Sequence, residues 1–340
     1  MYRIFVQTLH LNQQQKNILN YFVGPLLFVW LSYAIYKQIQ HQHDVQQSWE
    51  LILSAFYHSQ RWKLLLVLGL MLVNWGVEAR KWQLQVKGIE VISFIEAFRA
   101  ILAGQALGFN TVNRIGEPAG RAAFLKDGNR LRGLALSVVG SMAQIIVTFL
   151  MGALSLLYMR IYILNGSRQL QGLNAFWLDG LIYVISIGIM LFTLAYFRLS
   201  GLIELLEKIP VVARHRFFVE KLEDFHWKEL TRILSLSFGR YWVFLLQYIL
   251  LLQVFNVEVF WLDACALIGV MFLVLAIVPT ITLAELGFRG KVSLILLGLL
   301  SANSIGIIAT AAGIWLINLI LPAIIGTLFL LGVRIFRTNK

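Results

Sequence analysis

The chain has 340 residues, of which 59% are hydrophobic and only 14% are charged, and its formal net charge is +12. Soluble globular domains carry about 25% charged residues, so this composition excludes an ordinary soluble protein and predicts a single integral membrane domain over residues 1–340. A positive net charge in such a chain indicates cytoplasmic loops rich in Lys and Arg. The basic residues are scattered over short loops, which argues against nucleic acid as a partner.

The apolar runs predict an all-α polytopic membrane protein with about six spanning helices. The predicted spans are Tyr21–Tyr36, Trp62–Trp82, Leu131–Tyr158, Phe176–Phe197, Leu230–Phe255 and Ile305–Val333. The N-terminus lacks the regions of a cleaved signal peptide, so we expect the first run to remain as a membrane helix. The single cysteine, Cys265, lies in an apolar run and indicates neither a disulfide nor a metal site.

A polar stretch at residues 110–126 interrupts the apolar pattern of the first half. It carries the polar and charged side chains Asn113, Arg114, Glu117 and Arg121. Ionisable groups at membrane depth are costly and are usually buried, paired and functional. The stretch follows a short helix rich in Ala and Gly, Phe94–Phe109, and such small residues let membrane helices approach closely. Pro118 suits the start of the next helix. We therefore expect a re-entrant helical hairpin over residues 94–127, with its irregular backbone buried in protein or lining a cavity.

A second polar stretch, Val278–Lys291, interrupts the apolar pattern near the other end of the chain. Its charged side chains are Glu285, Arg289 and Lys291. Apolar segments flank it on both sides, which predicts a second re-entrant hairpin over residues 262–300.

The distribution of basic residues predicts the sides of the membrane. The amphipathic linker 198–228 and the C-terminal end are basic and are expected in the cytoplasm, with both termini, whereas the loop Asn256–Asp263 has no Lys or Arg and is expected outside. The two hairpins then enter the membrane from opposite faces, one in each half of the chain (1–197 and 229–340). Inverted repeats of this kind place transporter sites near the membrane midplane.

Each break precedes a helix start and has basic residues nearby. A helix N-terminus presents unpaired N–H groups and the positive end of the helix dipole, and guanidinium groups hold phosphate bidentately. The breaks therefore predict a cationic site for an anionic headgroup, with Glu117 and Glu285 neutralising the cations in the empty state. Arg121 lies four residues after Glu117, on the same helix face. The alternative is that these residues form only structural ion pairs that lock the hairpins.

Glu78 lies near the end of the second predicted span. It is interpreted either as pairing with Arg80, Lys81 or another cation, or as a further contact to a headgroup. Arg80 and Lys81 themselves suit a cytoplasmic helix end.

No pattern of hydrolytic, transfer or metal chemistry is present in the sequence. It has no HExxH motif, Walker A motif or DxD pair, and its six His lie outside the two breaks. We therefore expect neither catalytic residues nor a metal or cofactor. The favoured function is movement of an anionic or phosphate-containing lipid between leaflets. The alternatives are a membrane-embedded enzyme of lipid or glycan assembly and a scaffold for a separate lipid-modifying enzyme.

These motifs resemble the lysylphosphatidylglycerol synthetase transmembrane family, also called the flippase-domain family. The first motif is matched by Gly116, Glu117 and Arg121. The second is matched by Pro279, Gly287 and Arg289, although here the acid precedes the glycine. The segment NWGVEARKW, Asn74–Trp82, is also similar to the end of the family's second helix. The resemblance covers about Arg61 to Phe336. It implies a stand-alone lipid translocase of a bacterial cytoplasmic membrane, without the aminoacyltransferase domain that follows in two-domain members.

Overall fold

The computed structural model describes residues 29–30, 33, 61–109, 111, 114–164, 175–206, 216–278 and 282–331. Within these ranges the chain is helical with short connections. The elements are α4 (Arg61–Val86), α5 (Phe94–Gly108), α6 (Gly116–Ala122), η2 (Asp127–Asn129), α7 (Arg130–Tyr158), η3 (Met159–Ile163), α8 (Ala175–Phe197), α9 (Leu199–Leu206), α11 (Arg216–Glu223), α12 (Trp227–Val254), α13 (Trp261–Ile277), α14 (Thr282–Leu297), α15 (Ser304–Trp315), η4 (Leu316–Ile320) and α16 (Leu321–Leu331).

Five helical stretches of the described residues are long and apolar enough to cross a membrane. They are Arg61–Val86, Asp127–Ile163, Phe176–Phe197, Trp227–Val254 and Ser304–Leu331. The second continues through α7 into the π-helical turn η3, and the last runs through α15, the π-helical η4 and α16. Each stretch overlaps a predicted span, which confirms a polytopic all-α membrane protein. The first predicted span, Tyr21–Tyr36, lies almost entirely outside the described residues.

The first polar stretch forms the predicted helix, break and helix. α5 begins with a capping box, in which Ser93 Oγ accepts from the Glu96 backbone N–H at 3.2 Å and the Glu96 carboxylate accepts from the Ser93 N–H at 2.8 Å. α5 and α6 then pack closely. A Cβ atom added to Gly120 would lie 2.6 Å from Gly104 Cα, so the two helices approach at a distance that only glycine allows. We call α5 and α6 the first hairpin.

The second polar stretch differs from the first, because most of it is helical. α13 ends before it, whereas α14 contains its charged residues Glu285, Arg289 and Lys291. The two helices pack against each other, and α13 also packs on α7 while α14 packs on α15. Residues 279–281, between the two helices, lie outside the described residues. We call α13 and α14 the second hairpin.

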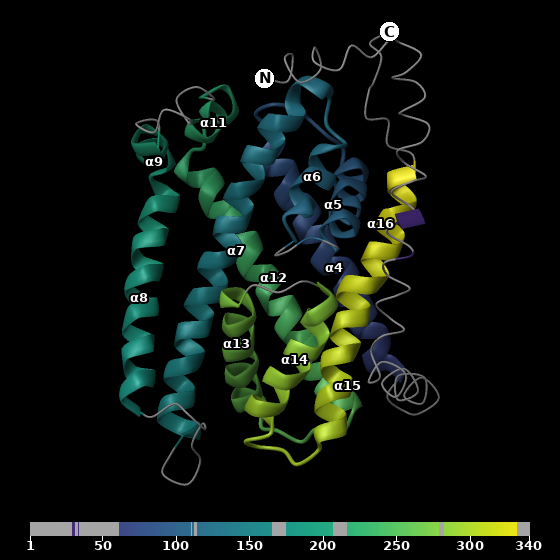
Figure 1. Ribbon diagram of the computed structural model, residues 1–340, viewed down its shortest axis with the longest axis vertical. Helices are drawn as coiled ribbons and strands as arrows, with labels where there is room; N and C mark the ends of the chain where they lie inside the picture. The colour runs from purple at the N-terminus through teal and green to yellow at the C-terminus, as the bar shows by residue number, and fades with distance from the viewer. Residues whose placement is uncertain are drawn as a thin grey trace.

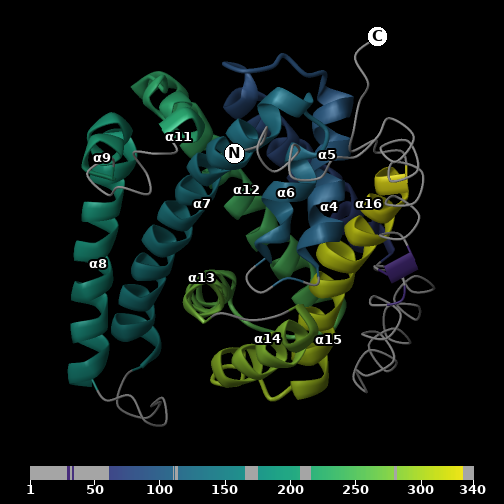
Figure 2. The same cartoon turned by 45° about the horizontal axis from the view of Figure 1, so that its top comes forward.

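The two hairpins lie in opposite halves of the molecule. Figure 1 shows α5 and α6 in the upper half, at the same end as α9 and α11 of the basic linker, and α13 and α14 in the lower half. α4 packs against both α12 and α5, and so connects the first hairpin to the rest of the bundle. α8 stands at the edge of the bundle beside α7 (Figures 1 and 2). That the two hairpins enter a membrane from opposite faces stays a prediction.

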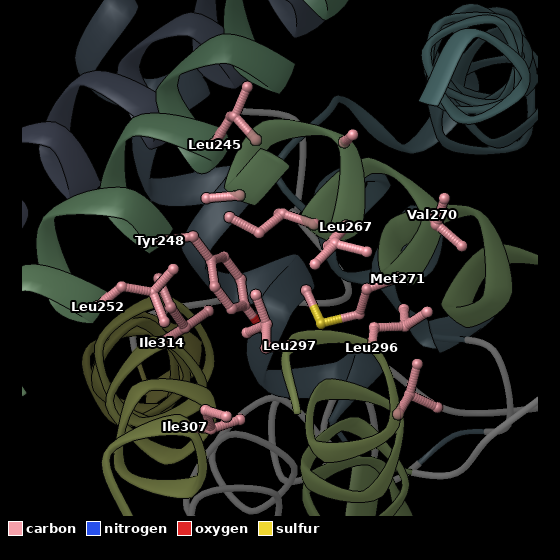
Figure 3. Packing of buried hydrophobic residues seen from close by; sticks show 14 of the residues in the cluster. Leu245, Tyr248, Leu252, Leu267, Val270, Met271, Leu296, Leu297, Ile307 and Ile314 are labelled. Atoms are coloured by element: carbon pink, nitrogen blue, oxygen red, sulfur yellow. The ribbon is translucent and has the colours of Figure 1, made fainter. Parts of the chain in front are cut away.

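The largest apolar cluster of the described residues surrounds the second hairpin. Figure 3 shows Tyr248 of α12 at its centre, among Leu267 and Met271 of α13, Leu297 of α14 and Ile314 of α15. Because these residues are buried on several sides, the cluster fixes the second hairpin against α12 and α15.

Candidate functional site

A buried carboxylate on α4 is the centre of a cluster of charges. Glu78 is 2% exposed and contacts three cations: Lys81 Nζ at 2.7 Å, Arg121 Nη1 at 2.8 Å and Arg240 Nη1 at 2.9 Å. Lys81 is one turn further along α4, whereas Arg121 belongs to α6 and Arg240 to α12. Glu78 therefore connects the first hairpin to two of the spanning helices.

Arg240 is held from several sides. Its Nε donates to Asn74 Oδ1 at 2.9 Å, and its guanidinium group lies 5.2 Å from the centre of the Trp75 ring and 5.5 Å from that of Phe244. Cation–π contacts favour a desolvated guanidinium group. The arrangement fixes Arg240 beside Glu78.

The first break continues the cluster from α6 toward the centre of the molecule. Arg121 Nη2 donates to Glu117 Oε2 at 3.1 Å, and Glu117 Oε1 lies 3.6 Å from Arg114 Nη1. The predicted pairing of Arg121 with Glu117 on one helix face is therefore present. Arg114 has φ 57°, a backbone conformation that non-glycine residues rarely adopt. Thr111 Oγ1 stabilises the turn, since it donates to the Gly108 carbonyl and accepts from the Gly116 N–H, each at 2.9 Å.

An ion pair joins the first break to α14 of the second hairpin. Arg114 Nη2 lies 3.1 Å from Glu285 Oε2 of α14, although the two residues are 171 positions apart in the chain. Glu285 Oε1 in turn accepts from Arg289 Nη2 at 2.6 Å, and Arg289 Nη1 donates to Tyr248 Oη at 3.0 Å. Tyr248 is the residue at the centre of the apolar cluster in Figure 3, so this end of the ion-pair chain rests on the core.

These residues form one connected group, which we call the charge network. It consists of the carboxylates Glu78, Glu117 and Glu285 and the cations Lys81, Arg114, Arg121, Arg240 and Arg289. Cations outnumber carboxylates by two, so the network as a whole is positive. Within the described residues, the buried Nε–H groups of Arg121 and Arg289 have no hydrogen-bond partner. A buried donor without a partner is costly, and both donors suit a ligand rich in acceptor oxygen atoms.

The structure places most of the predicted site residues in this network, namely Glu78, Arg114, Glu117, Arg121, Glu285 and Arg289. Lys291 is exposed on α14 and is not joined to the network. Asn113 lies outside the described residues.

The interpretation of the end of α4 needs a correction. Lys81 was expected at a cytoplasmic helix end, but it is 1% exposed and paired with Glu78. Arg80 is the exposed residue, and it donates to Gln83 at 3.0 Å rather than to Glu78. The reason is helical geometry, since Lys81 shares the face of Glu78 and Arg80 is turned away from it.

Sequence reasoning missed Arg240 and Tyr248. Arg240 lies in the middle of a predicted span, where a charged residue is itself a signal of function. Tyr248 gave no signal, because a tyrosine in an apolar helix is an ordinary core residue.

The fold and the site together define a class: a polytopic helical membrane protein in which two broken helical hairpins meet at a buried, mainly cationic network. The chain belongs to the family described as the lysylphosphatidylglycerol synthase TM region, whose model matches residues 17–326. Among curated proteins no significant match to the chain was found.

Proposed function

We propose that the protein moves a lipid with an anionic or phosphate-containing headgroup between membrane leaflets, and that the charge network receives the headgroup. The observation that carries the proposal is the Arg114–Glu285 ion pair, which joins two hairpins that lie in opposite halves of the molecule. Transporters with inverted repeats bind substrate between such broken helices. Membership of a lipid-related, flippase-type membrane family supports the same class of substrate.

The composition of the network favours an anion. Four of its five cations are arginines, and guanidinium groups bind phosphate oxygens in pairs. In the empty protein Glu117 and Glu285 neutralise part of this charge. A phosphate group that enters would replace Glu117 and Glu285 as the partner of Arg114, while the acyl chains stay in the bilayer.

The Arg114–Glu285 pair would then act as the connection that opens during transport. With a phosphate bound to Arg114, Glu285 keeps Arg289 as its partner at 2.6 Å. The exchange leaves no carboxylate unpaired, so it avoids the large cost of an isolated buried charge. The two hairpins could separate on one side at a time, as alternating access requires.

The experiment is a leaflet assay on the full chain reconstituted in vesicles. Fluorescent phosphatidylglycerol is placed in both leaflets, and a membrane-impermeant reductant quenches the outer label. We expect the wild type to expose the inner label within minutes, and Arg289→Gln to be slower by at least about tenfold, because a lost charged hydrogen bond costs about 1.5–3 kcal/mol.

Lys291→Gln is the matched control. It removes the same charge two residues along α14, but from an exposed position outside the network, so it should transport like the wild type. Equal loss in both variants would show that bulk positive charge, not the network, supports movement. Vesicles in which folded wild-type protein leaves the label in its leaflet would overturn the proposed function.

A further inference from the structure

A polar cavity lies apart from the charge network. It has a volume of about 210 Å³ and lies where the end of α4 meets α7, α11 and the start of α12, at the end of the molecule that carries the basic linker (Figure 1). Cavities for drug-sized ligands begin near 300 Å³. This one is therefore sized for a small polar molecule or a single headgroup rather than for a whole lipid.

Gln85 is among the lining residues, but its side-chain amide does not reach the open space of the cavity. Gln85 is 2% exposed, and within the described residues neither its Oε1 nor its Nε2 has a hydrogen-bond partner. The amide packs against Gly140, where any Cβ atom would collide with it. Because both amide atoms are covered by protein, a molecule in the cavity does not reach them, and recognition at this cavity rests on its charged lining.

The charges that line the cavity are balanced, in contrast to the charge network. Lys221 is neutralised by Asp224, with Nζ and Oδ2 2.7 Å apart. Lys87 and Glu229 remain as one cation and one carboxylate on the same lining. No described residue forms an ion pair with Lys87, and Glu229 has only the 3.4 Å bond from the His226 N–H to one of its oxygens.

The remaining lining is apolar, with Leu84, Leu136 and Phe225 among its residues. A simple anion in the cavity would face Glu229, and a simple cation would face Lys87. A ligand that carries both charges on a short linker satisfies both groups, and its linker can lie against the apolar wall.

We propose that this cavity binds a zwitterion made of a phosphate and a primary ammonium group, with the phosphate at Lys87 and the ammonium at Glu229. The headgroup of phosphatidylethanolamine and free phosphoethanolamine share this chemistry. The site does not depend on the lipid movement proposed above, because it shares no residue with the charge network.

The test is calorimetric titration of purified full-length protein with phosphoethanolamine, with inorganic phosphate and ethanolamine as separate probes. Phosphoethanolamine should bind at least about tenfold more tightly than either probe alone, since it makes both charged contacts. Lys87→Gln and Glu229→Gln should each reduce its affinity by about tenfold or more. Glutamine at position 229 can still take part in the capping box at the start of α12.

Arg80→Gln is the matched control, because it removes a neighbouring exposed charge of α4 that does not line the cavity. It should bind like the wild type. Nanodiscs show whether the natural ligand is the lipid headgroup or the free molecule. If phosphatidylethanolamine discs displace phosphoethanolamine and phosphatidylglycerol discs do not, the site belongs to the lipid. If neither disc displaces it, the site belongs to the soluble ligand. Inorganic phosphate binding as tightly as phosphoethanolamine, or Lys87→Gln binding like Arg80→Gln, would overturn the proposal.

Discussion

Removal of the Glu78 charge is the most severe single change that the structure predicts. Glu78→Gln keeps the shape of the side chain but removes the negative charge that lies within 2.9 Å of Lys81, Arg121 and Arg240. Breaking a buried ion pair from one side costs about 3–5 kcal/mol. We expect a loss of this size, which is about a 10²–10⁴-fold shift in the unfolding equilibrium. Arg121 keeps Glu117 as a partner, so the cost falls mainly on the other two cations.

The assay is reversible unfolding in mixed detergent micelles, followed by tryptophan fluorescence. Glu258→Gln is the control, since Glu258 is exposed on the connection between α12 and α13 and its change should stay within about 0.5 kcal/mol. Adding Lys81→Met to Glu78→Gln should recover part of the loss, because it removes one of the stranded cations. A loss no larger than that of Glu258→Gln, with no recovery in the double variant, would refute the view that Glu78 holds the network together.

Two further predictions concern the hairpins. Gly120→Ala should destabilise the protein by about 1–3 kcal/mol in the same assay, because its Cβ would lie 2.6 Å from the Gly104 backbone, whereas Gly128→Ala meets nothing within 4 Å and should be nearly neutral. Tyr248→Phe removes the hydroxyl that accepts from Arg289 at 3.0 Å. It should cost about 1.5–3 kcal/mol and slow the leaflet assay, and an unchanged rate would show that the orientation of Arg289 does not matter.

The sequence predicted the helices well because a membrane leaves few alternatives. Long apolar runs can cross the bilayer only as helices, and five of the predicted spans are helical over nearly their full length. The short helix before the first break was also predictable, from the small residues in Phe94–Phe109. The second polar stretch was not a break throughout, because Glu285, Arg289 and Lys291 lie within α14. The predicted opposition of the hairpins rests on counting basic residues in loops. Figure 1 shows α5–α6 and α13–α14 in opposite halves of the molecule, and the membrane faces from which they enter stay a prediction.

The partners within the site were harder to predict. Arg121 and Glu117 are four residues apart, so helical periodicity was enough to pair them. Arg121 also pairs with Glu78, however, and that contact depends on how α6 packs against α4. Neutralising Arg121 and Glu117 together would therefore still remove a partner from Glu78. The spacing of residues in the sequence predicts ion pairs within one helix, whereas ion pairs between helices can be predicted only when the packing of the helices is known.

The long sequence separation of the ion pairs has a consequence for how the chain is inserted into the membrane. Glu78 can pair with Lys81 as soon as α4 is made, but Arg240 follows 162 residues later and Glu285 follows Arg114 by 171. A lone charge in lipid is expensive, so Arg114 must rely on nearby Glu117 until the second hairpin is synthesised. When α12 enters the bilayer with Arg240, the acidic partner of Arg240, Glu78, is already in place. Each charged segment that is synthesised late would thus be placed by attraction to an opposite charge that was inserted earlier. In a ribosome-bound chain that ends before Glu285, Arg114 of the first hairpin would still lack its partner on the second hairpin.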